Sequence, residues 1–430
     1  MLYRNLYIEN AAELRDIRVE NGKFAEIGAN LAAKPGEDVR DFGGCLALPP
    51  LIESHVHLDT CLTAGDPVWN ESGTLFEGIE CWAKRKEKLT KADVRERVNR
   101  AVRLYAASGV QYIRTHVDVT DPKLTAMEAL LELRDELKDV VTLQIVAFPQ
   151  EGIESYPNGR RLMEDAVRMG ADCVGAIPHF EFTREYSVSS LNFAVSLAEK
   201  YDKLVDVHCD EIDDEASRGL ETLAARAYET GLADRVTASH TTAMHSYNNA
   251  YVQRLMRLLK LSRINFVSNP LVNTHLQGRV DTYPKRRGVT RVRDLTEAGI
   301  NVSFGHDDIF DPWYPMGTGS LRDVVFMGLH VCQMMGYGDI MNSCKFISTN
   351  AAKTLHLGDS YGIREGNPAS FIVLDAKNYY DALNRSAAVR LSCKNGRALA
   401  ETEPAAAREN EEEHKYIQKR LRTLHRTECS

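Results

Sequence analysis

Histidines and carboxylates recur in the sequence where apolar stretches end. His55 and His57 are two residues apart, so in an extended strand both imidazoles face the same side and could bind one metal ion. His208 ends a second apolar run, with Glu211 three residues later, and His240 ends a third. Considered singly, His55 and His57 could instead be surface or hydrogen-bonded histidines, and His208 could be a hydrogen-bonded histidine of the core. The acidic residues after His208 equally suit the start of a helix.

Two adjacent carboxylates, Asp307 and Asp308, follow the last apolar run of this kind. Either could instead cap the next helix. His245, five residues after His240, is expected on a following helix or loop and is a weaker candidate. Considered together, the four places favour one shared site, because clustered charges that are buried without a partner cost several kcal/mol. Three histidines and a carboxylate suit Zn²⁺ or Fe²⁺.

The elements that must position these residues alternate between two patterns. Short apolar runs recur along the middle of the chain, and the stretches between them place apolar residues at helical spacing, as in residues 124–139. About eight such units predict an α/β fold, a (β/α)8 TIM-like barrel over residues 51–357, whose strands end at one common face. An open doubly wound sheet is the alternative, but no GxGxxG motif follows the first strand.

The two ends of the chain carry an alternating apolar and polar pattern instead. Asn21-Gly22 and Asn395-Gly396 each lie between two such runs, which indicates β-hairpins. We therefore expect residues 1–50 and 358–400 to form a small discontinuous β-sandwich domain beside the barrel. The charged residues 401–430 are expected to form a tail or helix without a chemical role.

Composition narrows the class of protein. The 430 residues are 43% hydrophobic and 27% charged, with a net charge of −8, which is typical of a globular chain and unfavourable for a nucleic-acid surface. There is no run of about 18 apolar residues and no secretory pattern at the start, so we expect neither a membrane span nor export. Nine cysteines without a CxxC pair favour free thiols and a cytoplasmic protein.

Longer motifs around the candidate residues resemble one family. An HxH pair on the first strand, single histidines on the fifth and sixth, and an aspartate on the eighth are similar to the pattern of the amidohydrolase superfamily. Within it, the chain resembles the bacterial cytosine deaminases over most of its length. The segments that carry this resemblance are HVHLDT at 55–60, GTLFEGIE at 73–80, FPQEG at 148–152, HCDEIDD at 208–214, GHDD at 305–308 and DPWY at 311–314.

The resemblance implies a metal centre and a set of proton carriers. One divalent ion, zinc or iron, would be held by His55, His57, His208 and Asp307. Members with two metals need a carboxylated lysine at the end of the fourth strand, and residues 173–179 contain no lysine, which supports a single ion. Glu211 would move protons from water to the substrate, Asp307 would accept a second proton, and His240 would stabilise the developing oxygen charge.

The resemblance further implies the hydrolytic deamination of a free pyrimidine base, cytosine to uracil plus ammonia. Gln150 would hydrogen-bond to the edge of the ring, and Asp308 would lie near the exocyclic amine or C5. Leu75 and Trp313 would flank the ring, although core packing would also explain them. Leu62 makes one wall more apolar than is usual in the family, which predicts room for 5-methylcytosine, since burying a methyl group contributes about 0.8 kcal/mol.

Other functions stay open at this point. One is deamination or ring opening of another heterocycle, such as isoguanine, creatinine or a triazine. Another is a non-catalytic ligand-binding barrel, against which the histidine set and Glu211 argue. A deaminase of nucleic acid is disfavoured, because the H-x-E…P-C-x-x-C signature of those enzymes is absent. We expect a small-molecule substrate and a homo-oligomer, with neither a nucleic acid nor a membrane as partner.

Overall fold

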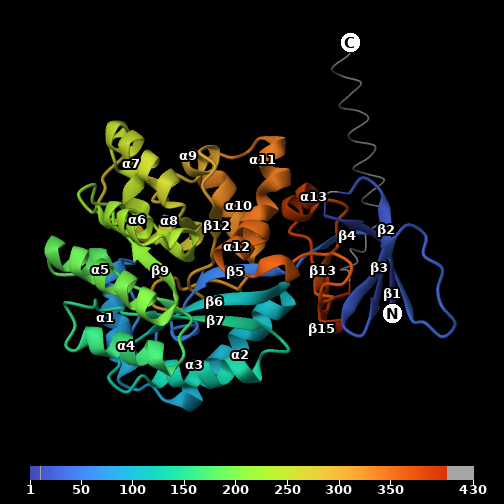
Figure 1. Ribbon diagram of the computed structural model, residues 1–430, viewed down its shortest axis with the longest axis horizontal. Helices are drawn as coiled ribbons and strands as arrows, with labels where there is room; N and C mark the ends of the chain where they lie inside the picture. Colours follow the sequence, from blue (N-terminus) through green and yellow to red (C-terminus); the bar gives the residue numbers. More distant parts are fainter. Residues whose placement is uncertain (10, 404–430) are drawn as a thin grey trace, which may run out of the picture.

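Eight parallel strands form the barrel that the sequence predicts (Figure 1). The structure is a computed structural model that describes residues 1–9 and 11–403. The barrel strands are β5 Leu51–Val56, β6 Val110–Asp118, β7 Thr142–Phe148, β8 Cys173–Val174, β9 Leu204–Cys209, β10 Val236–His240, β11 Asn265–Ser268 and β12 Val302–Phe304. They pair in chain order, and almost every residue in them is buried, as expected for strands that helices cover.

The barrel closes where the chain after β12 returns to β5. The backbone N–H of Asp307 donates to the carbonyl of His55 at 2.8 Å, and the N–H of His57 donates to the carbonyl of Asp307 at 2.9 Å. Glu53 supports the same junction, because its Oε1 accepts the backbone N–H groups of His55 and His306, each at 3.0 Å. Residues of the first and last barrel strands are thereby held side by side.

Helices surround the barrel strands (Figure 1). Their threonine and asparagine caps follow sequence rules: the side chain of Thr90, for example, accepts the N–H of Asp93 at 3.2 Å. The α-helices are α1 Leu75–Lys86, α2 Lys91–Ala107, α3 Thr125–Glu136, α4 Gly159–Met169, α5 Arg184–Tyr201, α6 Gly219–Thr230, α7 Asn249–Ser262, α8 Pro270–Leu276, α9 Val292–Glu297, α10 Leu321–Val331, α11 Tyr337–Asn342, α12 Thr349–Thr354 and α13 Tyr379–Asn384. Short 3₁₀ turns are η1 Pro178–Phe180, η2 Ala233–Arg235, η3 Thr242–His245, η4 Ser343–Ile347 and η5 Gly358–Ser360.

A second sheet joins the two ends of the described chain. Its strands are β1 Leu2–Ile8, β2 Leu14–Glu20, β3 Lys23–Gly28, β4 Val39–Leu48, β13 Phe371–Leu374, β14 Val389–Lys394 and β15 Arg397–Glu401, in the order β15-β14-β13-β4-β1-β2-β3. Asn21-Gly22 and Asn395-Gly396 connect β2 to β3 and β14 to β15 with positive φ at all four residues, so both predicted hairpins are present.

This sheet curls around a core of its own. At one edge, β3 meets the segment that leads into β13, because the N–H of Phe24 donates to the carbonyl of Asn367 at 3.0 Å. The enclosed cluster contains Tyr3, Phe24 and Phe371, with the rings of Tyr3 and Phe371 in edge contact at 5.1 Å. One continuous mixed sheet thus provides the small domain that was expected from both chain ends.

Two further expectations concern the rest of the chain. Of the predicted charged tail, residues 404–430 lie outside the described residues. Among the helices that the structure describes, none combines the length and the apolar character that a membrane crossing requires.

Candidate active site and metal centre

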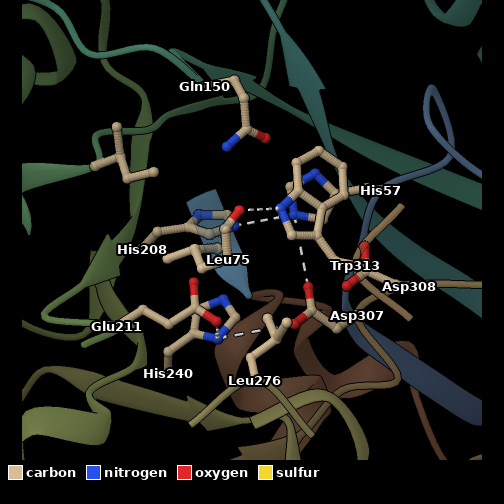
Figure 2. A pocket seen from close by; sticks show the side chains of 11 residues that line it. His57, Leu75, Gln150, His208, Glu211, His240, Leu276, Asp307, Asp308 and Trp313 are labelled. Carbon is tan, nitrogen blue, oxygen red and sulfur yellow. Dashed lines mark hydrogen bonds and ion pairs between the residues drawn. The ribbon is translucent and has the colours of Figure 1, made fainter. Parts of the chain in front are cut away.

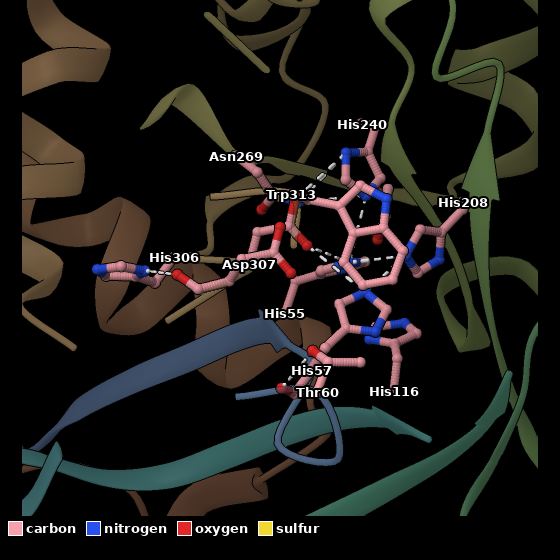
Figure 3. A network of polar contacts seen from close by, with 12 residues as sticks. His55, His57, Thr60, His116, His208, His240, Asn269, His306, Asp307 and Trp313 are labelled. Carbon is pink, nitrogen blue, oxygen red and sulfur yellow. Dashed lines mark hydrogen bonds and ion pairs between the residues drawn. The ribbon is translucent and has the colours of Figure 1, made fainter. Parts of the chain in front are cut away.

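The predicted metal ligands lie together at the C-terminal mouth of the barrel (Figure 3). His55 and His208 come from β5 and β9, His57 directly follows β5, and Asp307 follows β12. The Nε2 atom of His208 is 3.2 Å from that of His55 and 2.9 Å from that of His57. Asp307 Oδ1 is 3.3 Å from His55 Nε2 and 3.6 Å from His57 Nε2.

These four side chains fit a divalent metal ion. Tetrahedral ligands with bonds of about 2.0–2.1 Å stand about 3.3 Å apart, which is close to the spacings found here. Burial, together with the charges of neighbouring histidines, lowers the pKa of His55, His57 and His208 well below the usual value. The rings are therefore neutral and their lone pairs are free to bind a cation. Burial also raises the pKa of Asp307 well above the usual value, as expected for a carboxyl group that needs a cation beside it.

The backbone at two of these strand ends is unusual. Asp307 has a φ of 71° and His240, which ends β10, has a φ of 65°. Non-glycine residues adopt such left-handed conformations at a cost of about 1–3 kcal/mol, and they concentrate at functional sites. Both side chains line the cavity at the mouth of the barrel.

Glu211 and His240 form a second group beside the metal ligands. His240 Nδ1 is 3.1 Å from Glu211 Oε1 and 3.8 Å from Asp307 Oδ2, and His240 Nε2 is 3.3 Å from His55 Nε2. Burial lowers the pKa of His240, but the negative charges of Glu211 and Asp307 outweigh burial and raise it to about 9. A cation held by the four ligands would act in the opposite direction.

A cavity of about 300 Å³, counting its opening to solvent, lies over this group (Figure 2). Gln150 and Asp308, predicted to contact a substrate, line it together with Leu75 and Trp313. The amide of Gln150 points into the cavity and makes no hydrogen bond to the described residues. The remaining lining residues are His57, Ile177, His208, Glu211, His240, Leu276 and Asp307.

The indole of Trp313 is held firmly in the cavity wall. Its Nε1 donates to the carbonyl of Leu75 at 3.2 Å, and its backbone N–H donates to Asp311 Oδ1 at 3.0 Å. Asp311 in turn accepts the hydroxyl of Thr60 at 2.7 Å. The ring passes directly over Gly78, where any Cβ atom would collide with it.

Leu62 is the predicted substrate contact that the structure does not place at the cavity. Its backbone is left-handed, with a φ of 62°, and its N–H donates to the carbonyl of Ile309 at 2.9 Å, so its side chain packs against the barrel core. The apolar wall expected from Leu62 is provided instead by Ile177 and Leu276, which follow β8 and end α8. Ile177 lies three residues beyond the end of β8, and that position was the available signal, whereas Leu276 lies eight residues beyond β11 at the end of a helix.

Two further polar residues near the site were missed. His116, on β6, packs its ring against that of His55 with centroids 3.9 Å apart, and its Nε2 is 3.6 Å from Asp206 Oδ1 (Figure 3). Asn273, on α8, contacts both Glu211 and His240, and its place in the segment after β11 was the available signal. His179, in the segment after β8, accepts the backbone N–H of Glu211 at 3.3 Å and is not among the metal ligands.

Comparison with known proteins gives a consistent assignment. A model of the amidohydrolase family matches residues 38–400. The solved structure of 5-methylcytosine deaminase from Klebsiella pneumoniae, liganded with 5-fluorocytosine, is 50% identical and superposes with a TM-score of 0.93, covering 95% of this chain and 99% of that one. N-isopropylammelide isopropylaminohydrolase from Burkholderia multivorans is 25% identical with a TM-score of 0.80, covering 93% and 98%.

Curated relatives are more distant in sequence. N-isopropylammelide isopropyl amidohydrolase of Pseudomonas sp. strain ADP is 28% identical over 95% of this chain and 98% of its own length. Pterin deaminase of Rhizobium rhizogenes is 26% identical over 90% and 88%. The family match spans most of the sequence. The chain therefore belongs to the amidohydrolase family, as a hydrolase of carbon–nitrogen bonds other than peptide bonds.

Proposed function

We propose that this enzyme deaminates a free pyrimidine base, converting 5-methylcytosine to thymine and cytosine to uracil, with release of ammonia. The observation that carries the proposal is the cavity, in which one amide, two carboxylates and an apolar wall face the predicted metal ligands. The similarity to 5-methylcytosine deaminase at 50% identity supports this substrate class.

The lining of the cavity favours a planar ring that carries hydrogen-bonding groups on its edge. Gln150 offers both a donor and an acceptor to one edge of the ring, as a neutral base with adjacent C=O and N–H groups requires. Ile177 and Leu276 supply apolar surface for a methyl substituent, worth about 0.8 kcal/mol when fully buried.

We further propose that His55, His57, His208 and Asp307 hold one zinc or iron ion. Such an ion supplies Lewis acidity and lowers the pKa of water toward about 7. The donor set of three neutral imidazoles and one carboxylate suits either metal.

The chain's own residues then divide the proton transfers. Glu211 accepts a proton from the attacking water and delivers it to the ring nitrogen next to the amino-bearing carbon, which makes that carbon electrophilic. Asp307 accepts the second water proton, and this proton passes to the departing amino group with the help of Glu211, so that ammonia leaves. His240 donates a hydrogen bond to the oxygen that gains negative charge. Trp313 and Leu75 hold the plane of the ring and exclude water.

The direct test is ammonia release from a panel of bases by the metal-loaded enzyme. We expect 5-methylcytosine and cytosine to give higher kcat/KM than isoguanine, creatinine and N-isopropylammelide. Glu211→Gln should lose about 10²–10⁴ in kcat with its metal content unchanged. Glu221→Gln is a matched control, because Glu221 pairs with Tyr251 and Arg254 outside the cavity. Turnover of neither pyrimidine, or full activity in Glu211→Gln, would overturn the assignment.

A related heterocycle is the second candidate. The amidohydrolases named for N-isopropylammelide are 25–28% identical over nearly the whole chain. If N-isopropylammelide exceeds both pyrimidines in kcat/KM, the site is that of a triazine hydrolase instead.

A further inference from the structure

His116, on β6, is a wholly buried histidine that the proposed reaction does not use. The centroid of its ring is 3.9 Å from that of His55, and the two planes are tilted by 32°. Its ring also lies 4.7 Å from that of His208 and 5.4 Å from that of His57. One ring thus packs against all three imidazoles of the predicted metal centre, and its closest partner is His55 (Figure 3).

His55 depends on this contact more than His208 does. Metal-binding histidines usually hydrogen-bond their second ring nitrogen to a carboxylate or carbonyl group, which fixes the orientation of the ring. The Nδ1 atom of His55 is buried and has no such partner among residues 1–9 and 11–403. The same holds for His208, but there Phe148 stacks on the ring at 4.0 Å. The closest ring contact that can restrain the His55 imidazole is the one with His116.

His116 is itself held against a polar network in the barrel interior. Asp206 Oδ1 lies 3.6 Å from its Nε2, and Asp206 accepts the guanidinium of Arg114 at 2.8 Å and the hydroxyl of Ser239 at 2.6 Å. Arg114 also donates to the carbonyl of Thr354 at 2.7 Å. Neither ring nitrogen of His116 makes a hydrogen bond within the described chain. The ring therefore contacts its neighbours by packing, and its shape is what the site uses.

We propose that His116 is a positioning residue whose ring holds the His55 imidazole in the orientation that binds the metal ion. The inference rests on the proposed metal-binding function and is independent of which base is the substrate. Without the ring, space opens beside His55, and the His55 side chain can turn away from the other three ligands. The requirement is for a flat ring of this size, so a phenyl ring should meet it and an aliphatic side chain should not.

The zinc affinity of the full-length protein tests this role without turnover. We would measure the dissociation constant by competition with a chelator for the wild type, His116→Phe, His116→Leu and His116→Ala. Loss of a residue that orients a metal ligand weakens metal binding by about 10–100-fold, which we expect for His116→Leu and His116→Ala. His116→Phe should stay within about 3-fold of the wild type, because a swap of similar volume costs little.

Tyr112→Leu is the matched control, because Tyr112 lies on the same strand and its ring contacts that of Tyr361 outside the site. Its zinc affinity should stay within about 3-fold of the wild type. Urea denaturation of each variant separates lost metal binding from lost folding. If His116→Ala does not fold, the comparison of His116→Phe with His116→Leu decides. Equal zinc affinity in His116→Leu and the wild type, or equally weak binding in His116→Phe and His116→Leu, would overturn the proposal.

Cobalt gives a readout of the ligand geometry itself. Co²⁺ occupies sites of imidazole and carboxylate ligands, and its visible absorption depends on how those ligands are arranged. We expect the same spectrum for the cobalt-loaded wild type and His116→Phe, and a changed spectrum for His116→Leu. Identical spectra for the wild type and His116→Leu would show that the ring does not orient His55 and would overturn the proposal.

These readouts separate the inference from the proposed reaction. A protein whose zinc affinity depends on His116 as expected, but which deaminates no pyrimidine base, would overturn the substrate assignment alone. A protein that deaminates pyrimidines and binds zinc equally well in all His116 variants would overturn the inference alone.

Discussion

A buried ion pair behind the cavity offers a sharp test of the structure. Lys86, in the last turn of α1, contacts Asp118 Oδ2 at 2.9 Å and Glu151 Oε1 at 2.6 Å. The side chains of Lys86 and Asp118 are 11% and 3% exposed, so water screens this pair little. Asp118 also accepts the indole N–H of Trp82 at 2.9 Å and the backbone N–H of Thr120 at 2.7 Å. The pair ties α1 to the end of β6, next to Gln150.

We expect Lys86→Met to destabilise the protein by about 3 kcal/mol at pH 7. Removing one partner of a buried pair costs about 3–5 kcal/mol, because the other charge stays buried. The hydrogen bonds that Asp118 keeps from Trp82 and Thr120 place this site at the low end of that range. Lys86→Met/Asp118→Asn should recover most of the loss, because the charge that then lacks its partner, on Glu151, is 30% exposed and stays hydrated.

The lowered pKa of Asp118 predicts how the stability of the wild type and of Lys86→Met changes with pH. Burial raises the pKa of Asp118, but the charge of Lys86 and the hydrogen bonds outweigh burial and lower it below the usual value. In the wild type this carboxylate therefore adds stability above about pH 4, which is lost as the pH falls through the lowered pKa. In Lys86→Met burial raises the pKa above the unfolded value, so stability falls as the pH rises through the window from about 4 to the raised pKa.

Urea denaturation of the zinc-loaded protein, followed by circular dichroism at pH 7 and pH 4, measures both effects. The difference between wild type and Lys86→Met should be larger at pH 7. Lys84→Met, at an exposed position of the same helix, is the matched control. A loss under about 1 kcal/mol at pH 7, or a difference that grows toward pH 4, would show that the buried pair does not work as described.

Three further predictions concern the metal, the cavity and the second sheet. Elemental analysis of the wild type should find about one zinc or iron ion per chain. His208→Ala should retain under about 0.2 ion per chain, because it loses one of only four ligands. Equal metal content in both proteins would exclude this site. Gly78→Val should raise KM severalfold or more at nearly unchanged metal content, because the valine side chain displaces the Trp313 indole. An unchanged KM would mean that Trp313 does not contact the substrate. Burial lowers the pKa of Lys394 to about 8, below the usual value of about 10.4, so the free energy of unfolding of the wild type should rise between pH 8 and 10. Lys394→Met should not show this rise, and identical pH profiles of the two proteins would contradict the burial of Lys394.

The barrel was predictable because its strands are buried on both faces. Runs such as residues 143–148 (LQIVAF) are mostly apolar, and their regular alternation with helical segments leaves few topologies. Both Asn-Gly hairpins followed from local turn chemistry alone. The clustering of the metal ligands followed from the barrel, since parallel strands end at one face.

The cavity walls were less accessible from the sequence. The direction of the Leu62 side chain depends on a left-handed backbone conformation, which the sequence does not predict because leucine rarely adopts it. Ile177, Leu276 and Asn273 lie in the irregular segments or short helix that follow strands, where no periodicity tells which side chains face inward. The role of His116 could not be predicted for a different reason. Its polar partner inside the barrel, Asp206, comes from a strand far away in the sequence.

The junction between β5 and β12 has a consequence for how the ligand set is assembled. The hydrogen bonds that seal the barrel there use the backbone of Asp307, while its carboxylate points to the histidines. Closure of the barrel and placement of the fourth ligand therefore depend on the same residue. Backbone hydrogen bonds do not depend on the side chain, so replacing Asp307 by asparagine should leave the β5–β12 junction intact. The ligand at this position can therefore change without loss of the barrel.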